Sequence, residues 1–349
     1  MQEDKDIVRQ TTGPFALERQ LVDAVDRVIA AAESPNTRRA YAAQLKKFEA
    51  WCERLGVAVL PAPPAMVATY LVDLAETGAH PTGSQKRRKV ATVALALSAI
   101  ADAHRRRGDE FNTRAPELRT ALKGIRRAYA QPVAQAAALM PKMIRAILYE
   151  LEDTPIDRRD GALIALLFAG ALRRSEISRL DYAEVGTGDG YLALTSEAVE
   201  IVLLRSKART EPVTVKIPRA DNPLLVAALE HWIAIAGIGT GEALFRSIKK
   251  GGHIRGRLAD GGVCLALKAR IASYLRGCGW PREAAEAEAK KYSGHSGRVG
   301  MYTAASEAGV PIEAVAALAR HKSLNVAQKY ARHADQLRRA PSRNPTIAI

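Results

Sequence analysis

Two short segments place an arginine three residues from a group that can work with it. In "SGHSGRVG" a serine and a glycine separate His295 from Arg298, and in "GALRRSEI" Arg173 stands three residues before Glu176. This i, i+3 spacing puts both members of a pair on one face of a helix. The small residues between His295 and Arg298 also allow another backbone to come close. Because an arginine fork donates two parallel hydrogen bonds to a phosphate, the segments point to phosphate chemistry.

Three further positions complete a set that can cleave a DNA strand. Lys207 lies in "RSKARTEP", where we expect a turn between two strands, while His321 and Tyr330 follow in "ARHKSLNVAQKYARH". Cleavage without a metal needs a nucleophile, cations for the non-bridging oxygens and an acid for the leaving 5′ oxygen. Each residue alone also has an ordinary structural interpretation, such as a helix ion pair, a solvated lysine or an aromatic at the core edge. The hypothesis of DNA strand cleavage therefore rests on the whole set of residues and on their order along the chain.

In this order the motifs resemble those of the tyrosine recombinases, or phage integrases. The matching segments are "GALRRSE", "RSKART", "SGHSGRVG", "LARHKS" and "VAQKYARH", with "SPNTRRAYAAQLKKFEAWCERLG" resembling the first core-binding helix. The resemblance covers about 300 residues, from Ser34 to His333, and "SGHSGRVG" resembles the Cre-like members most.

The resemblance implies a role for every residue of the set. The scissile phosphate would be bound by Arg173, His295, Arg298 and His321. Lys207 would be the general acid for the 5′ hydroxyl, Glu176 would support the site geometry, and Tyr330 would be the nucleophile that forms a 3′-phosphotyrosyl link. The phosphodiester energy would stay in that link, so the resemblance implies no metal and no nucleotide cofactor.

Charge and composition agree with a nucleic-acid partner. The 349 residues include 52 Lys and Arg against 37 Asp and Glu, a net charge of +15, which favours DNA over the alternative of an acidic membrane surface. The longest apolar runs are too short to cross a bilayer. The N-terminal residues are polar and acidic rather than those of a signal peptide, and the three cysteines show no paired spacing. We therefore expect a cytoplasmic, nucleoid-associated protein with no membrane partner.

The periodicity predicts a mainly α-helical chain with one small antiparallel β-sheet, and the resemblance implies that its two domains form a DNA clamp. An N-terminal segment, 1–33, precedes a helical core-binding domain at 34–130. A charge-free linker at 131–141 leads to an α+β catalytic domain at 142–333, in which helical patterns resume from Pro223 after the strands. The tail, 334–349, is a possible docking element for a partner protomer.

Basic residues concentrate in the helical domain, where 17 stand against 8 acidic residues between positions 36 and 131. We predict phosphate contacts there, with Arg87 and Arg88 as candidates for the major groove. The full DNA-binding prediction comprises Arg38, Arg39, Lys86, Arg87, Arg88, Lys89, Arg105, Arg106, Arg126 and Arg127, with Arg205 and Arg209 of the catalytic domain.

The resemblance further implies a monomer in solution that forms a homotetramer on two double-stranded DNA sites with inverted repeats. Two alternatives remain open. One is a type IB topoisomerase-like enzyme that nicks and reseals a single strand, and the other is a DNA-binding architectural protein without catalytic activity.

Overall fold

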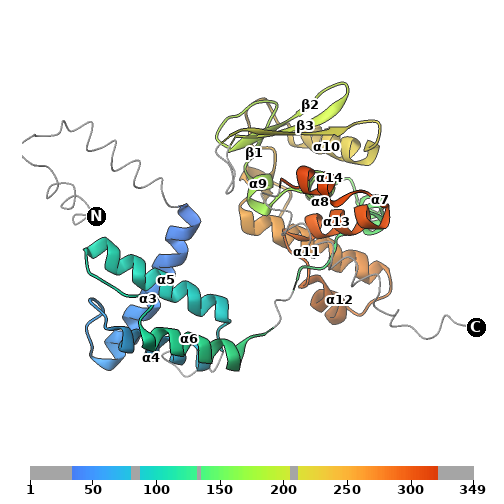
Figure 1. The fold of residues 1–349 in the computed structure, drawn as a ribbon. Coiled ribbons are helices and arrows are strands. Elements are labelled where there is room, and N and C mark those ends of the chain that lie inside the picture. The colour runs from blue at the N-terminus through green and yellow to red at the C-terminus, as the bar shows by residue number, and fades with distance from the viewer. Residues whose placement is uncertain (1–33, 80–86, 132–134, 205–210, 321–349) are drawn as a thin grey trace, which may run out of the picture. The chain divides into compact units, whose positions relative to one another are not determined.

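The computed structural model describes residues 34–79, 87–131, 135–204 and 211–320. The chain divides into two compact units, Met1–Val133 and Ala134–Ile349, which are described separately (Figure 1). Within the described ranges no helix is long and apolar enough to cross a membrane.

The described part of the first unit consists of helices α3 (Pro35–Leu55), α4 (Pro64–Glu76), α5 (Val90–Arg107) and α6 (Pro116–Tyr129). Their core contains the buried rings of Phe48 and Tyr70, whose centroids are 4.9 Å apart. Ser34 is the N-cap of α3, and its hydroxyl accepts the hydrogen bond from the Thr37 backbone N–H at 3.1 Å. The helix therefore begins at Pro35, with proline at its first position.

The second unit is mainly helical. Its described helices are α7 (Pro141–Glu150), α8 (Pro155–Ala169), α9 (Arg174–Ser178), α10 (Pro223–Ala236), α11 (Asp260–Gly277), α12 (Arg282–Ala289), α13 (Ser296–Glu307) and α14 (Ile312–Leu318). Helix α8 lies at the centre, because its apolar run "GALIALLFA" is covered by α10, α11 and α13. A helix that is apolar all round can only be accommodated in such a buried position.

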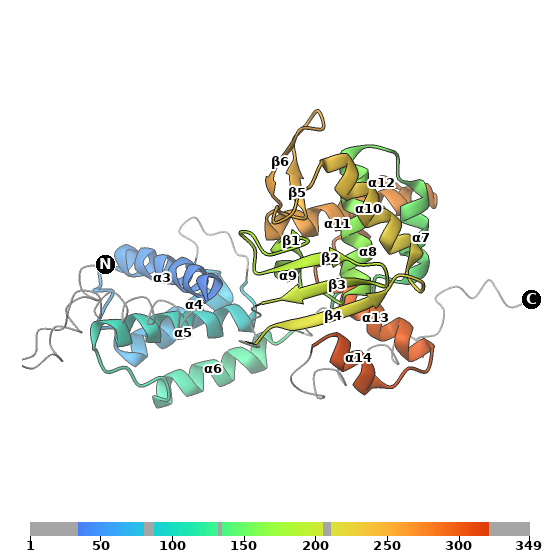
Figure 2. The ribbon, with the colours of Figure 1, turned by 90° about the horizontal axis from the view of Figure 1, so that it is seen from above.

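A four-stranded sheet covers part of this helical core (Figure 2). Its strands are, in spatial order, β1 (Leu180–Tyr182), β2 (Gly190–Leu194), β3 (Ala198–Leu203) and β4 (Val213–Pro218). The pairs β2–β3 and β3–β4 are antiparallel as predicted, but β1 runs parallel to β2, so the sheet is mixed. The Asp181 carboxylate explains the difference: it accepts hydrogen bonds from the N–H groups of Gly186 and Gly188, each at 2.7 Å, and so folds the loop back along β1.

A second hairpin, β5 (Arg246–Ile248) with β6 (Ile254–Arg257), interrupts a region for which the sequence predicted helices. That part of the prediction is wrong. Gly251 and Gly252 form the turn, with φ of 94° and 82°. Residues with a β-carbon rarely adopt such positive φ values, so glycine suits both positions. The two glycines are the tip of a hairpin rather than part of a helical region.

Candidate active site

Glu176 is the centre of the candidate site. Arg173 is the N-cap residue of α9, and its backbone N–H donates to Glu176 Oε2 at 2.8 Å. The Arg173 guanidinium donates from Nη1 to Oε1 of the same carboxylate at 2.6 Å. Glu176 is buried, so the start of α9 holds one carboxylate against an arginine whose side chain is 25% exposed. The predicted pairing of these two residues is present.

Helix α13 brings Arg298 to the same carboxylate from a distant part of the chain. Arg298 is 2% exposed, and its Nη2 lies 3.4 Å from Glu176 Oε2. Gly297 makes this approach possible, because a Cβ atom there would stand 2.4 Å from the carbonyl oxygen of Leu167 in α8. The small residues of "HSGR" thus allow the close backbone contact that the sequence suggested.

His295 and Arg298 differ in burial, although three residues separate them as the motif requires. His295 is the N-cap residue of α13, with φ −93° and ψ −11°, and it is exposed whereas Arg298 is buried. Its nearly helical backbone still leaves the imidazole within the electrostatic reach of Arg298, Arg173 and Arg174. The pKa of His295 is lowered, first by desolvation of the ring and then by these cations, so the imidazole is neutral at neutral pH and carries one N–H donor.

A third arginine, Arg320, reaches Glu176 from the end of α14, and sequence reasoning missed it. Its Nη2 donates to Glu176 Oε2 at 3.0 Å, and the residue is 7% exposed. In a chain with 52 basic residues, nothing in the segment "LARHKS" marks this arginine as buried. Its only sequence signal is its position directly before His321.

The three arginines keep Glu176 ionised. Burial by itself raises the pKa of this carboxyl, but the cations of Arg320, Arg298 and Arg173, with the Arg173 backbone N–H, outweigh it and leave the pKa below its usual value. Three guanidinium groups and one carboxylate carry a net charge of +2. The cluster is therefore suited to an anion, and a phosphate is the anion that arginine forks recognise best.

Arg173 rather than Arg174 belongs to this cluster. Arg174 is exposed, and its Nη1 lies 3.7 Å from the Cys264 sulfur on α11. Gly294 packs so closely against it that a Cβ there would be 2.6 Å from Arg174 Cβ. The structure thus shows which of the two adjacent arginines contacts Glu176, whereas the sequence motif assigns that role only by its position.

The remaining predicted catalytic residues, Lys207, His321 and Tyr330, lie outside the described residues, as do Lys86, Arg205 and Arg209.

The predicted DNA-binding residues of the first unit differ in their surroundings. Arg105 and Arg106 both pair with the buried Asp102, the latter at 2.7 Å, so one carboxylate offsets part of that cluster. The other described members are Arg38, Arg39, Lys89, Arg126 and Arg127, all exposed, with the half-buried Arg88 and with Arg87, whose guanidinium lies 5.4 Å from the Tyr129 ring centroid.

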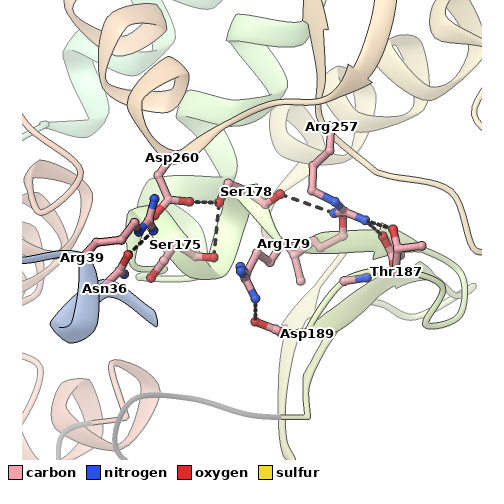
Figure 3. A network of polar contacts seen from close by, with 12 residues as sticks. Asn36, Arg39, Ser175, Ser178, Arg179, Thr187, Asp189, Arg257 and Asp260 are labelled. Carbon is pink, nitrogen blue, oxygen red and sulfur yellow. Dashed lines mark hydrogen bonds and ion pairs between the residues drawn. The ribbon is translucent and has the colours of Figure 1, made fainter. Parts of the chain in front are cut away.

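A polar network fixes the base of the β5–β6 hairpin beside α9 (Figure 3). Arg257 donates to the Leu180 carbonyl at 3.0 Å and to the Thr187 hydroxyl at 2.9 Å, and it pairs with the buried Asp181. Nearby, the Ser178 hydroxyl donates to Asp260 at 2.6 Å, which joins the end of α9 to the start of α11 (Figure 3).

The tip of this hairpin is a basic surface that the sequence predictions overlooked. Lys249, Lys250, His253 and Arg255 are all exposed. Within the part of the chain that the structure describes, neither lysine nor Arg255 has an ion-pair partner. The run "KKGGHIRGR" carried the signal, but its expected helical context hid it.

Comparisons with known proteins agree with this geometry. The model of the Phage integrase family matches residues 138–337. An integrase/recombinase XerD homolog of Selenomonas ruminantium is 28% identical over 308 residues, 85% of this chain and 82% of that protein. The tyrosine recombinase XerC of Myxococcus xanthus is 24% identical over 300 residues, covering 85% and 87% of the two chains.

Among solved structures, the XerH site-specific recombinase bound to palindromic difH substrate has the same fold. Its TM-score is 0.55 at 14% identity, over 96% of this chain and 92% of XerH. The family match spans more than half of the chain and includes the Glu176 cluster. The chain therefore belongs to the phage integrase family and is a tyrosine-type site-specific recombinase.

Proposed function

We propose that this recombinase cleaves and rejoins DNA strands through a 3′-phosphotyrosyl intermediate on Tyr330. The observation that carries the proposal is the arginine cluster around Glu176, with its net charge of +2 and the neutral His295 beside it. A phosphodiester brings one negative charge, and attack on phosphorus adds a second on the non-bridging oxygens. The excess charge of the cluster matches the transition state better than the ground state, which is the requirement for catalysis.

The chemistry then divides among the proposed residues. The Tyr330 oxygen, on losing its proton, forms the bond to phosphorus, and the bond to the 5′ oxygen breaks. Lys207 donates a proton to that oxygen, while Arg173, Arg298, His295 and His321 hold the phosphate. Attack by the 5′ hydroxyl of a partner strand reverses these steps and regenerates the tyrosine. One phosphodiester replaces another, so the exchange requires no external energy source.

We further propose that four protomers act on two DNA sites, each site with inverted repeats. Support comes from the XerH structure, whose DNA is palindromic, because a palindrome presents two equivalent half-sites to two protomers. The same proposal includes three further features. The protein is a monomer in solution, residues 34–130 and 142–333 form the two halves of a DNA clamp, and residues 334–349 dock on a neighbouring protomer. Placement nearest to Cre-like members rests on "SGHSGRVG" alone, since the relatives found are Xer-type proteins.

A suicide substrate tests the chemistry. DNA from the flanks of the element that carries this gene would be nicked so that the cleaved fragment diffuses away, and wild type would be compared with Tyr330→Phe on denaturing gels. We expect a covalent protein–DNA product with wild type only, while both proteins bind the DNA. Binding without any adduct would favour the architectural alternative. Nicking and resealing without strand exchange between two sites would favour the topoisomerase-like alternative.

A further inference from the structure

The backbone of Arg320 is held in a conformation that arginine seldom adopts. Its φ is 56°, in the left-handed region, directly after α14 ends. For a residue with a β-carbon this conformation is strained and persists only where the surroundings impose it. Ala171, in the turn between α8 and α9, is strained in the same way, with φ 42°. The two strained residues are in direct contact through the Arg320 side chain.

Both terminal nitrogens of the Arg320 guanidinium are engaged within the protein, whereas its buried Nε has no hydrogen-bond partner among the described residues. Nη1 donates to the carbonyl oxygens of Gly170 at 3.1 Å and Leu318 at 3.2 Å. Nη2 donates to the Ala171 carbonyl at 3.1 Å and to Glu176 Oε2 at 3.0 Å. Each terminal nitrogen carries two N–H groups, so all four are used. Arg320 consequently has no terminal donor left for a DNA phosphate.

These contacts tie three parts of the site together. The Gly170–Ala171 turn leads into Arg173, Glu176 binds Arg173 and Arg298, and Arg320 itself is joined by a peptide bond to His321. Arg320 is also the cation that contributes most to lowering the pKa of Glu176. Loss of Arg320 would leave the Oε2 atom with one backbone N–H and the longer contact to Arg298.

We propose that Arg320 is a positioning residue: one guanidinium binds both the Gly170–Ala171 turn and Glu176, and so fixes the phosphate-binding arginines Arg173 and Arg298 relative to the end of α14. The contacts of Arg320 with the turn and with Glu176 are part of the structure, whereas their consequence for cleavage rests on the proposed function. Arg320 acts through Glu176 and does not touch the DNA.

The test compares Arg320→Gly, which suits the left-handed backbone but removes the guanidinium, with Arg320→Lys, which keeps the charge but loses the fork. The matched control is Arg270→Lys, since Arg270 is a half-buried arginine of the same unit that pairs with the buried Asp157 and Asp160. Single-turnover cleavage of the suicide substrate and DNA affinity would be measured for each.

We expect both Arg320 variants to cleave saturating DNA on the order of ten- to a hundredfold more slowly, with nearly unchanged affinity, because small displacements of reacting groups cost this much. Dilute guanidinium ion should partly restore cleavage by Arg320→Gly, and the acid limb of its pH–rate profile should move to higher pH as the Glu176 pKa rises. Arg270→Lys should show neither the rescue nor the shift.

Wild-type cleavage and an unmoved acid limb in Arg320→Gly would overturn the proposal. If Arg320→Gly fails to fold, Arg320→Lys decides by its single-turnover rate, because lysine keeps the charge beside Glu176 but loses the fork. Should the wild type form no adduct, the proposed function fails first. The positioning role is then judged by urea unfolding at neutral pH, where an Arg320→Lys variant as stable as wild type would reject it.

Discussion

Replacing Glu176 by glutamine removes the charge that keeps three arginines together while preserving almost the same shape. In the wild type both carboxylate oxygens only accept hydrogen bonds: Oε1 from Arg173, and Oε2 from Arg173 N–H, Arg320 and Arg298. Glutamine offers one oxygen and one NH₂ group. Whichever way the amide is turned, at least one donor of an arginine then faces another donor.

The cost follows from the burial of the group. A pair of unit charges about 4 Å apart is worth roughly 4 kcal/mol at an effective dielectric constant near 20, but desolvation offsets much of this gain. Removing one partner of a buried ion pair nevertheless costs about 3–5 kcal/mol, since the remaining charge stays buried and uncompensated. We expect Glu176→Gln to lower the free energy of unfolding of the second unit by about that amount at neutral pH.

The same reasoning fixes the pH dependence. The folded-state pKa of Glu176 lies below its unfolded value, so its ionised form contributes stability that is fully present above the unfolded pKa of about 4.3. That contribution is lost as the pH falls through the lowered folded-state pKa. Wild type and Glu176→Gln should therefore differ most at neutral pH and converge in acid, where Glu176 becomes protonated in both states.

Tryptophan fluorescence during urea unfolding measures this difference. In a Trp51→Phe background the remaining tryptophans, Trp232 and Trp280, both lie in the second unit and report on it alone. Glu286→Gln is the control, because Glu286 forms an exposed ion pair and its loss should have no measurable effect. A Glu176→Gln variant as stable as wild type at neutral pH, or a gap that stays constant in acid, would refute the reasoning.

Two other predictions concern packing and DNA contact. Gly297→Ala should destabilise the second unit by about 1–3 kcal/mol, because its Cβ would collide with a backbone carbonyl of α8. The control, Gly261→Ala in α11, places its Cβ in open space and should be neutral or slightly stabilising. Equal urea midpoints for the two variants would contradict the packing argument. Replacing Lys249 and Lys250 with glutamine should reduce the slope of log K against log salt by about 2 for DNA binding. The control, Lys216→Gln, breaks only the ion pair with Glu200 on the neighbouring strand and should leave this slope unchanged. If the slope of the Lys249 and Lys250 variant is also unchanged, the hairpin does not contact DNA.

The sequence predicted the parts of the site that depend on local spacing. Arg173 and Glu176 form the expected pair because a helix start brings positions three apart together, and Gly297 allows the expected backbone contact. Periodicity could not bring Arg298 to Glu176, since 122 residues separate them. That proximity was implied only by the family resemblance, which carries tertiary information that single-chain patterns lack.

The parts that were missed depend on tertiary contacts. Arg320 is buried because carbonyl oxygens of a distant turn converge on it, and an arginine before a histidine gives no sign of this. Strand β1 is parallel to β2 because one carboxylate folds a loop back. The β5–β6 hairpin was hidden because glycines at helix ends and glycines at hairpin turns look alike in sequence.

The Glu176 cluster lowers the stability of the folded unit in two ways, and a bound phosphate can offset one of them. Two residues with positive φ, Ala171 and Arg320, and an excess charge of +2 around Glu176 each make the folded unit less stable than an uncharged, unstrained packing would be. An enzyme that stabilises developing charge must fix its donors before the reaction, at the expense of folding stability. A bound phosphate would neutralise part of the excess. The excess charge around Glu176 therefore lies where a phosphate ligand, rather than the fold alone, can compensate for it.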